Sequence, residues 1–505
     1  MKYRFNNEAG SLKERICKIN NISEEALDVS GFKPDYDLHI LNDFKEKLLS
    51  DKDKRFFIVG DYDCDGICAT TIMMRLLDSL GIRANYYIPS RSKEGYGINE
   101  RIVDTAIENG FEALLCVDNG IVAEEQLLKA REAGLNTYVI DHHEYHELPK
   151  ADAILHPSLF PQEYHDMCAS GVCAFLANSF MEDSLYFAYG GLATLADMVS
   201  VFDYNRYLMK KMIEVLKNED IYPLKYLLGS KTSFDDLSYN VIPKINAVSR
   251  LDEHMNVNYV VRYLLDNSPD CQKYLNKIEA INIERKDLSR QMAALASRIM
   301  DRDLDPIIVR SDSFKEGLCG LIANRIMSET GKAVLVLSEV NDELKGSGRS
   351  PKGADLYSYL KKTSDIFTSF GGHQQAVGLS LKKDDYEKLL NYVKENSFEY
   401  EENEKEVLEF DQDEMSFELL NELEELKPFG TDFVEPLLGL KDVRFSKKFM
   451  IKGMYPKFTL NENLEAISFD PANGNKQFNT MIGHLKKDDY RAYRLSFVIE
   501  DLLQF

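Results

Sequence analysis

The stretch RFFIVGDYDCDG, residues 55–66, joins an apolar run to an acidic turn. RFFIVG has the length and composition of a buried strand, and it leads directly into Asp61. The segment after the turn, CATTIMMRLLDSLG, is apolar around most of its circumference and indicates a buried helix. A strand, an acidic turn and a helix are therefore expected to follow one another without a linker.

The same alternation continues along the next eighty residues or so. ANYYIP, ALLCV and NTYVI read as further strands, and NERIVDTAIENG and AEEQLLKAREAG read as the helices between them. Such a pattern predicts a parallel sheet with helices on both faces. Asp61, Asp118 and Asp141 each follow the carboxyl end of a predicted strand, which is the edge where open parallel sheets bind ligands. Three strands should thus bring acidic side chains to one rim.

The predicted secondary structure changes several times along the rest of the chain. Residues 155–235 look mainly helical, and residues 275–300 read as a long charged helix that could serve as a rigid connector. Strand–helix alternation returns from residue 305, and short strands beyond Gly430 suggest a small β-barrel. The expected divisions are an N-terminal helical segment (1–50), a catalytic α/β domain (51–215), a helical region with the connector (216–300), a second α/β domain (301–394), an acidic linker (395–430) and the barrel (431–505).

The composition limits where the protein works. Eight cysteines are scattered without a CxxC pair, which suits a reducing cytosol and argues against disulfides or a structural zinc site. No apolar run of about eighteen residues is present, and the N-terminal MKYRFNNEAGSLKER lacks the apolar core of a secretory signal. We therefore expect a cytoplasmic protein.

The net charge of −23 is unusual for a nucleic-acid-binding protein. Residues 395–427 contain fourteen Asp or Glu and two Lys, a local charge of −12, so about half of the excess lies in one segment. A binding channel needs only a local positive potential, and the remaining surface can repel polyanions. The charge therefore does not exclude nucleic acid as a substrate.

The acidic turn DYDCDG, residues 61–66, is ambiguous by itself. It can converge three carboxylates on a hard divalent cation, and Gly66 permits a close bend into the helix. The same letters fit a calcium loop or the nucleophile motif of an aspartyl-phosphate phosphatase. An EF-hand is excluded because a strand precedes the turn and the position that requires Glu is Ile72. A solvated acidic turn without a ligand stays open at this point.

Three further elements supply possible ligands, namely Asp118 in VDNG, His142 in DHH and Asp197 in LADMV. Asp197 lies in an apolar helical run, where an unpaired carboxylate is costly, so a metal or a basic partner is expected. Mixed Asp and His ligation favours Mn²⁺, whereas Mg²⁺ is typically bound by oxygen ligands alone. Such a set can hold two cations about 3.5–4 Å apart, which activates water for phosphoryl displacement. The expected ligands are Asp61, Asp63, Asp65, Asp118, His142 and Asp197.

These motifs, in this order, resemble those of the DHH phosphoesterase superfamily, and more closely those of its RecJ-type single-stranded-DNA-specific exonucleases. The resemblance runs from about residue 55 to the C-terminus. It is carried by GDYDCDG, IPSRSKEGYGIN, VDNGI, DHH, ASGVCAF, LADMV, PKINAVSRL, GLCGLIANR, KGSGRS, GGHQQAVG and PFG…EP. It implies an α/β fold of two lobes, a DHH domain with a parallel sheet and a DHH-associated domain, joined by a long helix. The DNA strand would pass between the lobes, and an OB-type β-barrel would follow them.

The resemblance also implies roles for single residues. Asp141 would orient the ring of His142, and His143 would contact the scissile phosphate, so Asp141 and His143 are the expected catalytic residues. Arg91, Ser347 and Arg349 would hold the terminal 5′-phosphate, because an Arg fork is bidentate to phosphate and the glycines of KGSGRS would let backbone amides approach it. The backbone of the strand would be gripped by Asn246, Arg250 and His373.

The expected barrel mixes basic and aromatic residues, a composition that suits stacking of single-stranded bases. An ordinary barrel with core aromatics remains an alternative. The residues are Arg444, Lys447, Lys448, Lys452 and Lys457 with Phe445, Phe449, Tyr455 and Phe458.

The leading hypothesis is a 5′-to-3′ exonuclease that hydrolyses single-stranded DNA to 5′-mononucleotides in recombination and repair. Its cofactors would be two Mn²⁺ or Mg²⁺ ions, and it would act as a monomer with a single-strand-binding protein and a helicase as partners. A DHH enzyme for short oligoribonucleotides or cyclic dinucleotides is an alternative, although it would need no distant strand-binding domain. An inactive DHH scaffold would not be expected to keep the full acidic set. A haloacid-dehalogenase-like phosphatase would leave the DHH motif unexplained.

Overall fold

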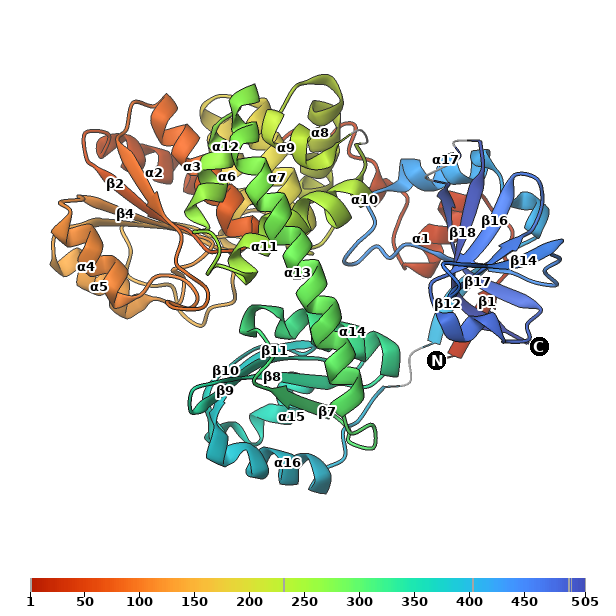
Figure 1. Cartoon of the computed structure of the whole chain (residues 1–505). Coiled ribbons are helices and arrows are strands. Elements are labelled where there is room, and N and C mark those ends of the chain that lie inside the picture. The colour runs from red at the N-terminus through yellow and green to blue at the C-terminus, as the bar shows by residue number, and fades with distance from the viewer. Residues whose placement is uncertain (1, 230–231, 402–403, 489–490, 492, 505) are drawn as a thin grey trace. The chain divides into compact units, whose positions relative to one another are not determined.

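The computed structural model describes residues 2–229, 232–401, 404–488, 491 and 493–504. The chain forms two compact units (Figure 1). Unit 1 comprises Met1–Phe32, Ser200–Arg206 and Glu402–Phe505, and unit 2 comprises Lys33–Val199 and Tyr207–Glu401.

A five-stranded, fully parallel sheet forms the first lobe of unit 2, in the order β3-β2-β4-β5-β6. The chain passes from β2 outward to β3 and then returns to β4 on the other side of β2. The strand order therefore reverses between β2 and β4, which is where ligands bind in open α/β sheets. The strands are β2 (Phe56–Val59), β3 (Ala84–Tyr87), β4 (Ala113–Val117), β5 (Asn136–Ile140) and β6 (Ala153–Leu155).

Helices cover both faces of this sheet. Ile102 and Val103 of α4, with Leu127 of α5, pack with apolar residues of β2, β4 and β5 in one core. Helix α3 packs against α6 and α7 and against strands β2 to β4 (Figure 1). Of these elements, all four predicted strands and the three helices that alternate with them are confirmed, and β6 was not predicted. The helices are α2 (His39–Ser50), α3 (Cys64–Ser79), α4 (Glu100–Glu108), α5 (Glu124–Glu132), α6 (Ala169–Phe180) and α7 (Ser184–Ala196).

A helical region separates the two sheets, as the sequence predicts. Its last and longest member is the straight helix α13, which extends to the second lobe of unit 2 and contacts α14 and β7 there (Figure 1). The region consists of α8 (Asp203–Asn218), α9 (Tyr222–Leu228), α10 (Phe234–Asp236), α11 (Ile242–Arg250), α12 (Asn258–Leu265) and α13 (Gln272–Ile299).

The second lobe of unit 2 has a mixed sheet in the order β10-β11-β9-β8-β7, in which only β7 and β8 are parallel. Its core includes Leu335, Leu344 and Leu379 together with residues of α15 and α16. The elements are β7 (Ile307–Ser311), α14 (Cys319–Thr330), β8 (Val334–Val340), β9 (Glu343–Arg349), α15 (Leu356–Lys361), β10 (Phe367–His373), β11 (Ala376–Lys382) and α16 (Tyr386–Glu395).

Unit 1 is built on an eight-stranded sheet in the order β1-β12-β13-β17-β18-β16-β15-β14. The register shifts between Ile482 and Gly483, and a Cβ at Gly483 would lie 2.0 Å from the carbonyl oxygen of Val498, so the close strand packing there requires glycine. The elements are β1 (Lys2–Asn6), α1 (Leu12–Ile19), β12 (Glu404–Phe410), α17 (Phe417–Leu426), β13 (Leu437–Leu440), β14 (Lys447–Ile451), β15 (Tyr455–Thr459), β16 (Leu464–Ser468), β17 (Thr480–Lys487) and β18 (Leu495–Leu503).

Two expectations about this unit are wrong. The N-terminal segment is not only helical, because Lys2–Asn6 form strand β1, which pairs in parallel with β12 (Figure 1). The acidic stretch is not a linker either, since its described residues include strand β12 and the amphipathic helix α17, whose Leu419, Leu420 and Leu423 are buried. Most of its described carboxylates face solvent, and the apolar residues of β12 and α17 complete the fold of unit 1.

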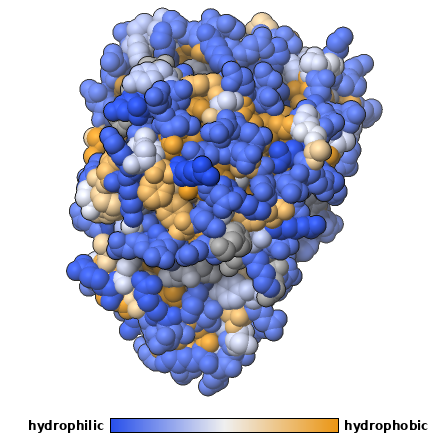
Figure 2. Space-filling model, turned by 90° about the vertical axis from the view of Figure 1, so that its right-hand side faces the viewer, coloured by the Kyte–Doolittle hydropathy of each residue, from blue (hydrophilic) through white to orange (hydrophobic). Residues whose placement is uncertain are grey.

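The surface is dominated by polar and charged side chains, with hydrophobic ones scattered among them on the face in Figure 2. Among the described residues, no helix combines the length and the apolar composition that crossing a bilayer requires.

Candidate metal centre

The acidic turn after β2 is held by close backbone packing. A Cβ at Gly66 would lie 2.5 Å from both the backbone nitrogen and the carbonyl oxygen of Asp61, so only glycine allows this approach. Asp63 is the N-cap of α3, and its carboxylate accepts hydrogen bonds from the backbone N–H groups of Asp65 (2.9 Å) and Gly66 (3.2 Å). The helix start therefore fixes the three carboxylates of the turn relative to one another.

Asp65 is anchored by a second helix. Its carboxylate accepts from the backbone N–H groups of Ala169 (2.9 Å) and Ser170 (2.8 Å), the first two residues of α6. The hydroxyl of Ser170 also donates to the carbonyl oxygen of Asp65 (2.7 Å). A helix N-terminus favours negative charge, so α6 can stabilise this buried carboxylate without a basic side chain.

Asp118 follows β4 in a left-handed backbone conformation, with φ of 60°. The next residue, Asn119, donates from its side-chain amide to the carbonyl oxygens of Val59 (3.0 Å) and Val117 (2.8 Å). This amide joins the ends of β2 and β4 at the position where the strand order reverses. The motif VDNG thus sets the distance between the two acidic turns.

His142 lies at the centre of the cluster. Its Nε2 is 3.3 Å from Asp118 Oδ1, 3.6 Å from Asp197 Oδ2 and 3.8 Å from Asp65 Oδ2. Ligand atoms of Asp61, Asp63 and Asp118 form a neighbouring group within 4.8 Å of one another. The structure therefore brings all six predicted ligands together, from the ends of β2, β4 and β5 and the end of α7.

Asp141 holds a different histidine from the one we expected. Its Oδ1 accepts from Nδ1 of His143 (2.7 Å) and from the backbone N–H of His142 (2.8 Å), and its Oδ2 accepts from the N–H of Ile121 (2.9 Å). The prediction that Asp141 orients the ring of His142 is wrong, because the turn after β5 points the ring of His143 toward the carboxylate. Both carboxylate oxygens of Asp141 thereby accept hydrogen bonds from the protein itself.

The electrostatics of the cluster match a cation site. Burial and the neighbouring carboxylates raise the pKa of Asp61 and Asp118 well above the usual value, and they raise the pKa of Asp197 to about 9. Burial lowers the pKa of His142, which favours the neutral imidazole that a metal requires. The Oδ1 atoms of Asp61 and Asp118 are buried, and they accept no hydrogen bond from any described residue. Unsatisfied buried carboxylate oxygens beside an imidazole fit a divalent cation such as Mn²⁺.

The pair Asp141–His143 has the opposite character. Burial lowers the pKa of His143, but the hydrogen bond to Asp141 outweighs this effect and raises the pKa to about 9. Burial raises the pKa of Asp141, and the same hydrogen bond outweighs it, so that this pKa is lowered. His143 is therefore a cationic, partly exposed side chain at the edge of the cluster, suited to contact a phosphate oxygen.

Tyr96 is a member of the site to which we assigned no role from the sequence. Its hydroxyl donates to the backbone carbonyl of Asp118 (3.0 Å) and lies 3.1 Å from Nδ1 of His143. The only sequence signal for it is its place in the motif IPSRSKEGYGIN, between Arg91 and the cluster. Residue type and periodicity alone do not distinguish it from a surface tyrosine.

A group of arginines lies beside the carboxylates. Burial lowers the pKa of Arg250 to about 10, and the nearby charges of Arg91, Arg285 and Arg349 add to that effect. Burial and Arg91 likewise lower the pKa of Arg349. These guanidinium groups come from the first lobe, from α11 and α13, and from β9 of the second lobe. Their mutual repulsion favours binding of an anion between them.

Gly317 allows the second lobe of unit 2 to approach α11 at this group, and Gly320 leaves room within the second lobe for the side chain of Arg349. A Cβ at Gly317 would lie 2.3 Å from the carbonyl oxygen of Arg250, whose Nη1 donates to the Gly317 carbonyl (3.3 Å). A Cβ at Gly320 would lie 3.0 Å from Nη2 of Arg349 and 3.6 Å from Oγ of Ser347. Ser347 and Arg349 thus lie together at the start of α14.

The glycines of KGSGRS have another purpose than the one expected. The segment is strand β9, which is paired on one side with β8 and on the other with β11. Cβ atoms at Gly346 and Gly348 would collide with Val336 and Leu335. The prediction that its backbone amides approach a phosphate is therefore wrong, because they pair with the neighbouring strands of the sheet. An anion could instead be bound by the side chains of Ser347 and Arg349.

The two other proposed backbone contacts differ in their surroundings. Asn246 lies on α11, and its Oδ1 is buried without a donor in the described part of the chain, as expected for a group that awaits a ligand. His373 is exposed at the end of β10. It pairs with Ala376 of β11, which pairs in turn with Arg349 of β9, and among the described residues no hydrogen bond or ion pair joins its side chain to the arginine group.

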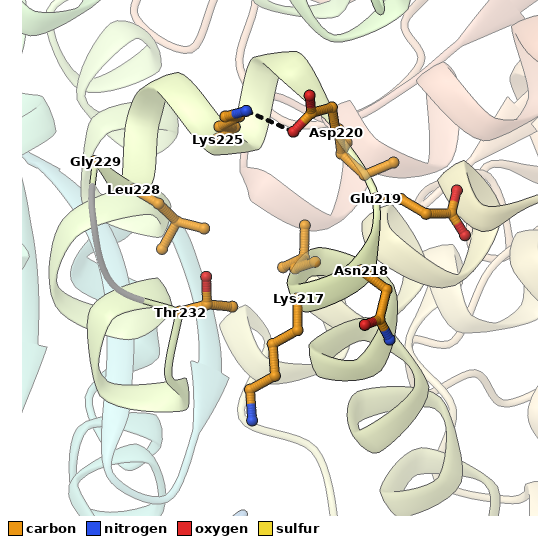
Figure 3. Close-up of a pocket in the computed structure, with 10 residues that line it drawn as sticks. Lys217, Asn218, Glu219, Asp220, Lys225, Leu228, Gly229 and Thr232 are labelled. Atoms are coloured by element: carbon orange, nitrogen blue, oxygen red, sulfur yellow. Dashed lines mark hydrogen bonds and ion pairs between the residues drawn. The ribbon is translucent and has the colours of Figure 1, made fainter.

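A separate pocket of about 470 Å³ lies between the end of α8 and α9 (Figure 3). The ion pair of Lys225 and Asp220 spans its rim at 2.5 Å. None of its lining residues belongs to the carboxylate cluster or to the arginine group.

In unit 1 the predicted basic and aromatic set divides between surface and core. Phe445 and Phe449 are exposed to 42% and 43%, and β14, which carries Lys447, Lys448 and Phe449, is an edge strand. Phe458 is fully buried, and Lys457 pairs with Glu465 at 2.7 Å. Only the part of the set on and beside β14 is therefore available to a ligand.

Comparison with known proteins agrees with this architecture. The DHH family N-terminal domain matches residues 55–199, the DHHA1 domain matches residues 292–396, and the RecJ OB domain matches residues 408–501. The chain is 30% identical over 404 residues to the single-stranded-DNA-specific exonuclease RecJ of Bacillus subtilis, which covers 75% of this chain and 50% of that relative. It is 29% identical over 431 residues to RecJ of Escherichia coli, covering 76% of this chain and 74% of that one.

Two solved structures have the same fold. The crystal structure of RecJ from Thermus thermophilus in complex with Mn²⁺ matches with a TM-score of 0.83 at 22% identity, over 100% of this chain and 80% of that chain. A crystal structure of exonuclease RecJ bound to manganese matches with a TM-score of 0.61 at 25% identity, over 70% of this chain and 93% of that chain.

A parallel sheet whose strand ends gather aspartates and the Asp-His-His motif, followed by a DHHA1 domain, places this chain in the DHH family. Within that family it is of the RecJ type, because a RecJ OB domain follows the two DHH-family domains and its relatives are RecJ proteins. The chain spans half the length of the Bacillus subtilis relative.

Proposed function

We propose that this chain is a divalent-metal-dependent exonuclease that degrades single-stranded DNA from the 5′ end and releases 5′-mononucleotides. The observation that carries the proposal is the cluster around His142, whose Nε2 has three carboxylates within 3.8 Å. RecJ relatives named as single-stranded-DNA-specific exonucleases, and RecJ structures with Mn²⁺ or Mg²⁺, support it.

Two metal ions would be held by Asp61, Asp63, Asp65, Asp118, His142 and Asp197. When bound, such a pair activates water and stabilises the attacking and leaving oxygens of a phosphodiester. The protein's own residues would do the positioning. Asp141 keeps His143 protonated and oriented, so that its imidazolium can donate to the scissile phosphate. Tyr96 would limit the movement of that ring.

The strand would be held by the arginine group. Arg91, Ser347 and Arg349 would bind the terminal phosphate, and Asn246 and Arg250 would contact the next part of the backbone. His373 is proposed as a further backbone contact. The exposed residues of β14 in unit 1 would provide a further contact with the strand, which distinguishes this chain from a DHH enzyme for short substrates.

The proposal places the protein in DNA recombination and repair in the cytoplasm, as a monomer. A single-strand-binding protein that delivers the strand and a helicase that produces it are the proposed partners. The division into domains at residues 51–215, 216–300 and 301–394 is proposed with it.

The test is digestion of one strand labelled at either its 5′ or its 3′ end, in DNA and RNA versions, with Mn²⁺ present. We expect the 5′ label to appear at once as a mononucleotide, whereas the 3′ label stays on progressively shorter strands. Faster digestion of RNA, or early release of the 3′ label, would contradict the assigned substrate or polarity.

A further inference from the structure

The loop that carries Arg91 is held from the first turn after α11. Asp252 accepts hydrogen bonds from the Ser90 hydroxyl (2.6 Å), the Ser92 backbone N–H (3.0 Å) and the Ser92 hydroxyl (2.7 Å). One carboxylate therefore binds the residue before Arg91 and the residue after it. Asp252 lies two residues beyond Arg250 in the sequence, so the same turn fixes both arginines.

The other side of the loop is fixed within the first lobe. Glu94 accepts from the backbone N–H of Ser90 (2.9 Å) and from the hydroxyl of Tyr87 (2.7 Å). The carbonyl of Ser90 accepts from the N–H of Glu94 (2.8 Å), which closes a tight turn. With Asp252 on one side and Glu94 on the other, the backbone at Arg91 has little freedom.

The Arg91 side chain is left unpaired by this arrangement. Its guanidinium lies 5.0 Å from the centre of the Tyr62 ring, between Asp61 and Asp63 in sequence. Across the described residues, Arg91 makes no hydrogen bond and no ion pair. The carboxylate of Asp252 accepts its three hydrogen bonds from the serines, and no ion pair joins it to Arg91 among the described residues. The N–H donors of the Arg91 guanidinium are therefore available to bind a ligand.

We infer that Asp252 is a positioning residue, which holds the Ser90–Ser92 loop so that Arg91 presents an unpaired guanidinium to the 5′-phosphate of the substrate. This inference rests on the proposed function and adds a residue to it. A guanidinium that is already in place before the ligand arrives loses less entropy on binding. Loss of Asp252 should therefore weaken recognition of the phosphate and leave the chemical step unchanged.

The experiment measures binding of short 5′-phosphorylated and 5′-hydroxyl oligodeoxynucleotides by fluorescence anisotropy in EDTA, so that no metal or turnover is involved. Wild type should prefer the phosphorylated end. Asp252→Ala should weaken binding of that end roughly tenfold, with less than about twofold change for the hydroxyl end. The double variant Ser90→Ala/Ser92→Ala removes the two hydroxyl hydrogen bonds from the other side and keeps that of the Ser92 backbone N–H, so it should give a selective loss of the same kind that is no larger.

Combining the three substitutions should weaken binding no further than Asp252→Ala alone, because Asp252→Ala already removes all three contacts. Asp266→Ala is the matched control, since Asp266 also accepts from a serine two residues away (2.6 Å) but lies at the end of α12. In turnover with Mn²⁺, Asp252→Ala should raise KM and leave kcat within about twofold. Equal loss for both ends, or additive losses in the combined variant, would overturn the inference. Wild type that binds both ends alike would overturn the 5′-end preference itself and the inference with it.

Discussion

Asp118 Oδ1 lies 3.3 Å from Nε2 of His142, although the two residues follow different strands of the sheet. Asp118 also belongs to the group with Asp61 and Asp63, whereas His142 belongs to the group with Asp65 and Asp197. The contact therefore joins two sets of ligands that have no member in common. Asp118 therefore lies where the two sets meet, and its carboxylate would help to hold divalent cations there.

Gly66→Ala should disrupt the acidic turn. The new Cβ would collide with the backbone of Asp61 at 2.5 Å, and overpacking of this kind costs about 1–3 kcal/mol. Urea unfolding should show that loss, and Mn²⁺-dependent activity should fall because Asp61 moves. Gly31→Ala is the control, since no atom lies within 4 Å of its Cβ position. Unchanged stability of Gly66→Ala would show that the turn tolerates the displacement.

Arg349→Ala should reduce the preference for a 5′-phosphate. The guanidinium is near Ser347 and Arg91, and no described carboxylate pairs with it, so its loss should raise KM for phosphorylated strands by at least about tenfold. Strands with a 5′-hydroxyl should be cleaved nearly as before. Arg325→Ala, which removes an exposed arginine paired with Glu329 on α14, should change neither value. An equal loss on both kinds of strand would refute the phosphate pocket.

Phe449→Ala should weaken binding of long strands. The ring is 43% exposed on the edge strand β14, and stacking of a base on an aromatic ring is worth about 1–3 kcal/mol. We expect weaker binding and lower processivity on a long single strand, with cleavage of a short oligomer unaffected. Val434→Ala changes an exposed apolar residue of the same unit and should have no effect. If long and short substrates lose equally, β14 does not bind the strand.

Asp51→Asn should destabilise unit 2 in a pH-dependent way. Burial raises the pKa of Asp51, but hydrogen bonds from Tyr138 (2.5 Å) and Asn136 (2.5 Å) and two lysine charges outweigh it, so this pKa lies below 3.8. The stabilisation by the carboxylate is therefore complete above pH 3.8 and is lost as the pH falls through the lowered pKa.

Urea unfolding should show a loss of about 1.5–3 kcal/mol for Asp51→Asn at neutral pH, because a buried charged hydrogen-bond acceptor is removed. The difference from wild type should shrink below about pH 4. Asp53→Asn, an exposed neighbour, serves as the control. A difference that stays constant down to about pH 3 would contradict the lowered pKa.

The cluster could be predicted because it depends on local rules. Strand ends of a parallel sheet meet at one edge, which brought Asp61 and Asp118 together, and the cost of an unpaired buried carboxylate identified Asp197. These arguments need only apolar periodicity and the position of a polar residue within it. They do not give the direction of a side chain within a turn, which is why the partner of Asp141 was assigned to His142 and not to His143.

Pairings between distant parts of the chain could not be predicted in this way. Strand β1 pairs with β12 some four hundred residues later, and no periodicity in Lys2–Asn6 indicates that partner. Glu404–Phe410 likewise form a strand with buried Val407 and Leu408, although the charged residues of this segment do not indicate one. KGSGRS has the composition of a turn, but its glycines are required by the two strands that enclose it. In each case the neighbouring strand, which the local sequence does not contain, decides the structure.

The most direct test of the metal centre is a Mn²⁺ titration followed by electron paramagnetic resonance, which counts bound ions without relying on turnover. The account predicts two ions per wild-type chain, and weaker or incomplete binding with loss of nuclease activity in Asp118→Asn, because Asp118 lies where the two sets of ligands meet. Asp104→Asn, which removes a surface partner of Lys129, should bind like wild type. Undiminished binding of two ions by Asp118→Asn, or no binding by wild type, would contradict the account.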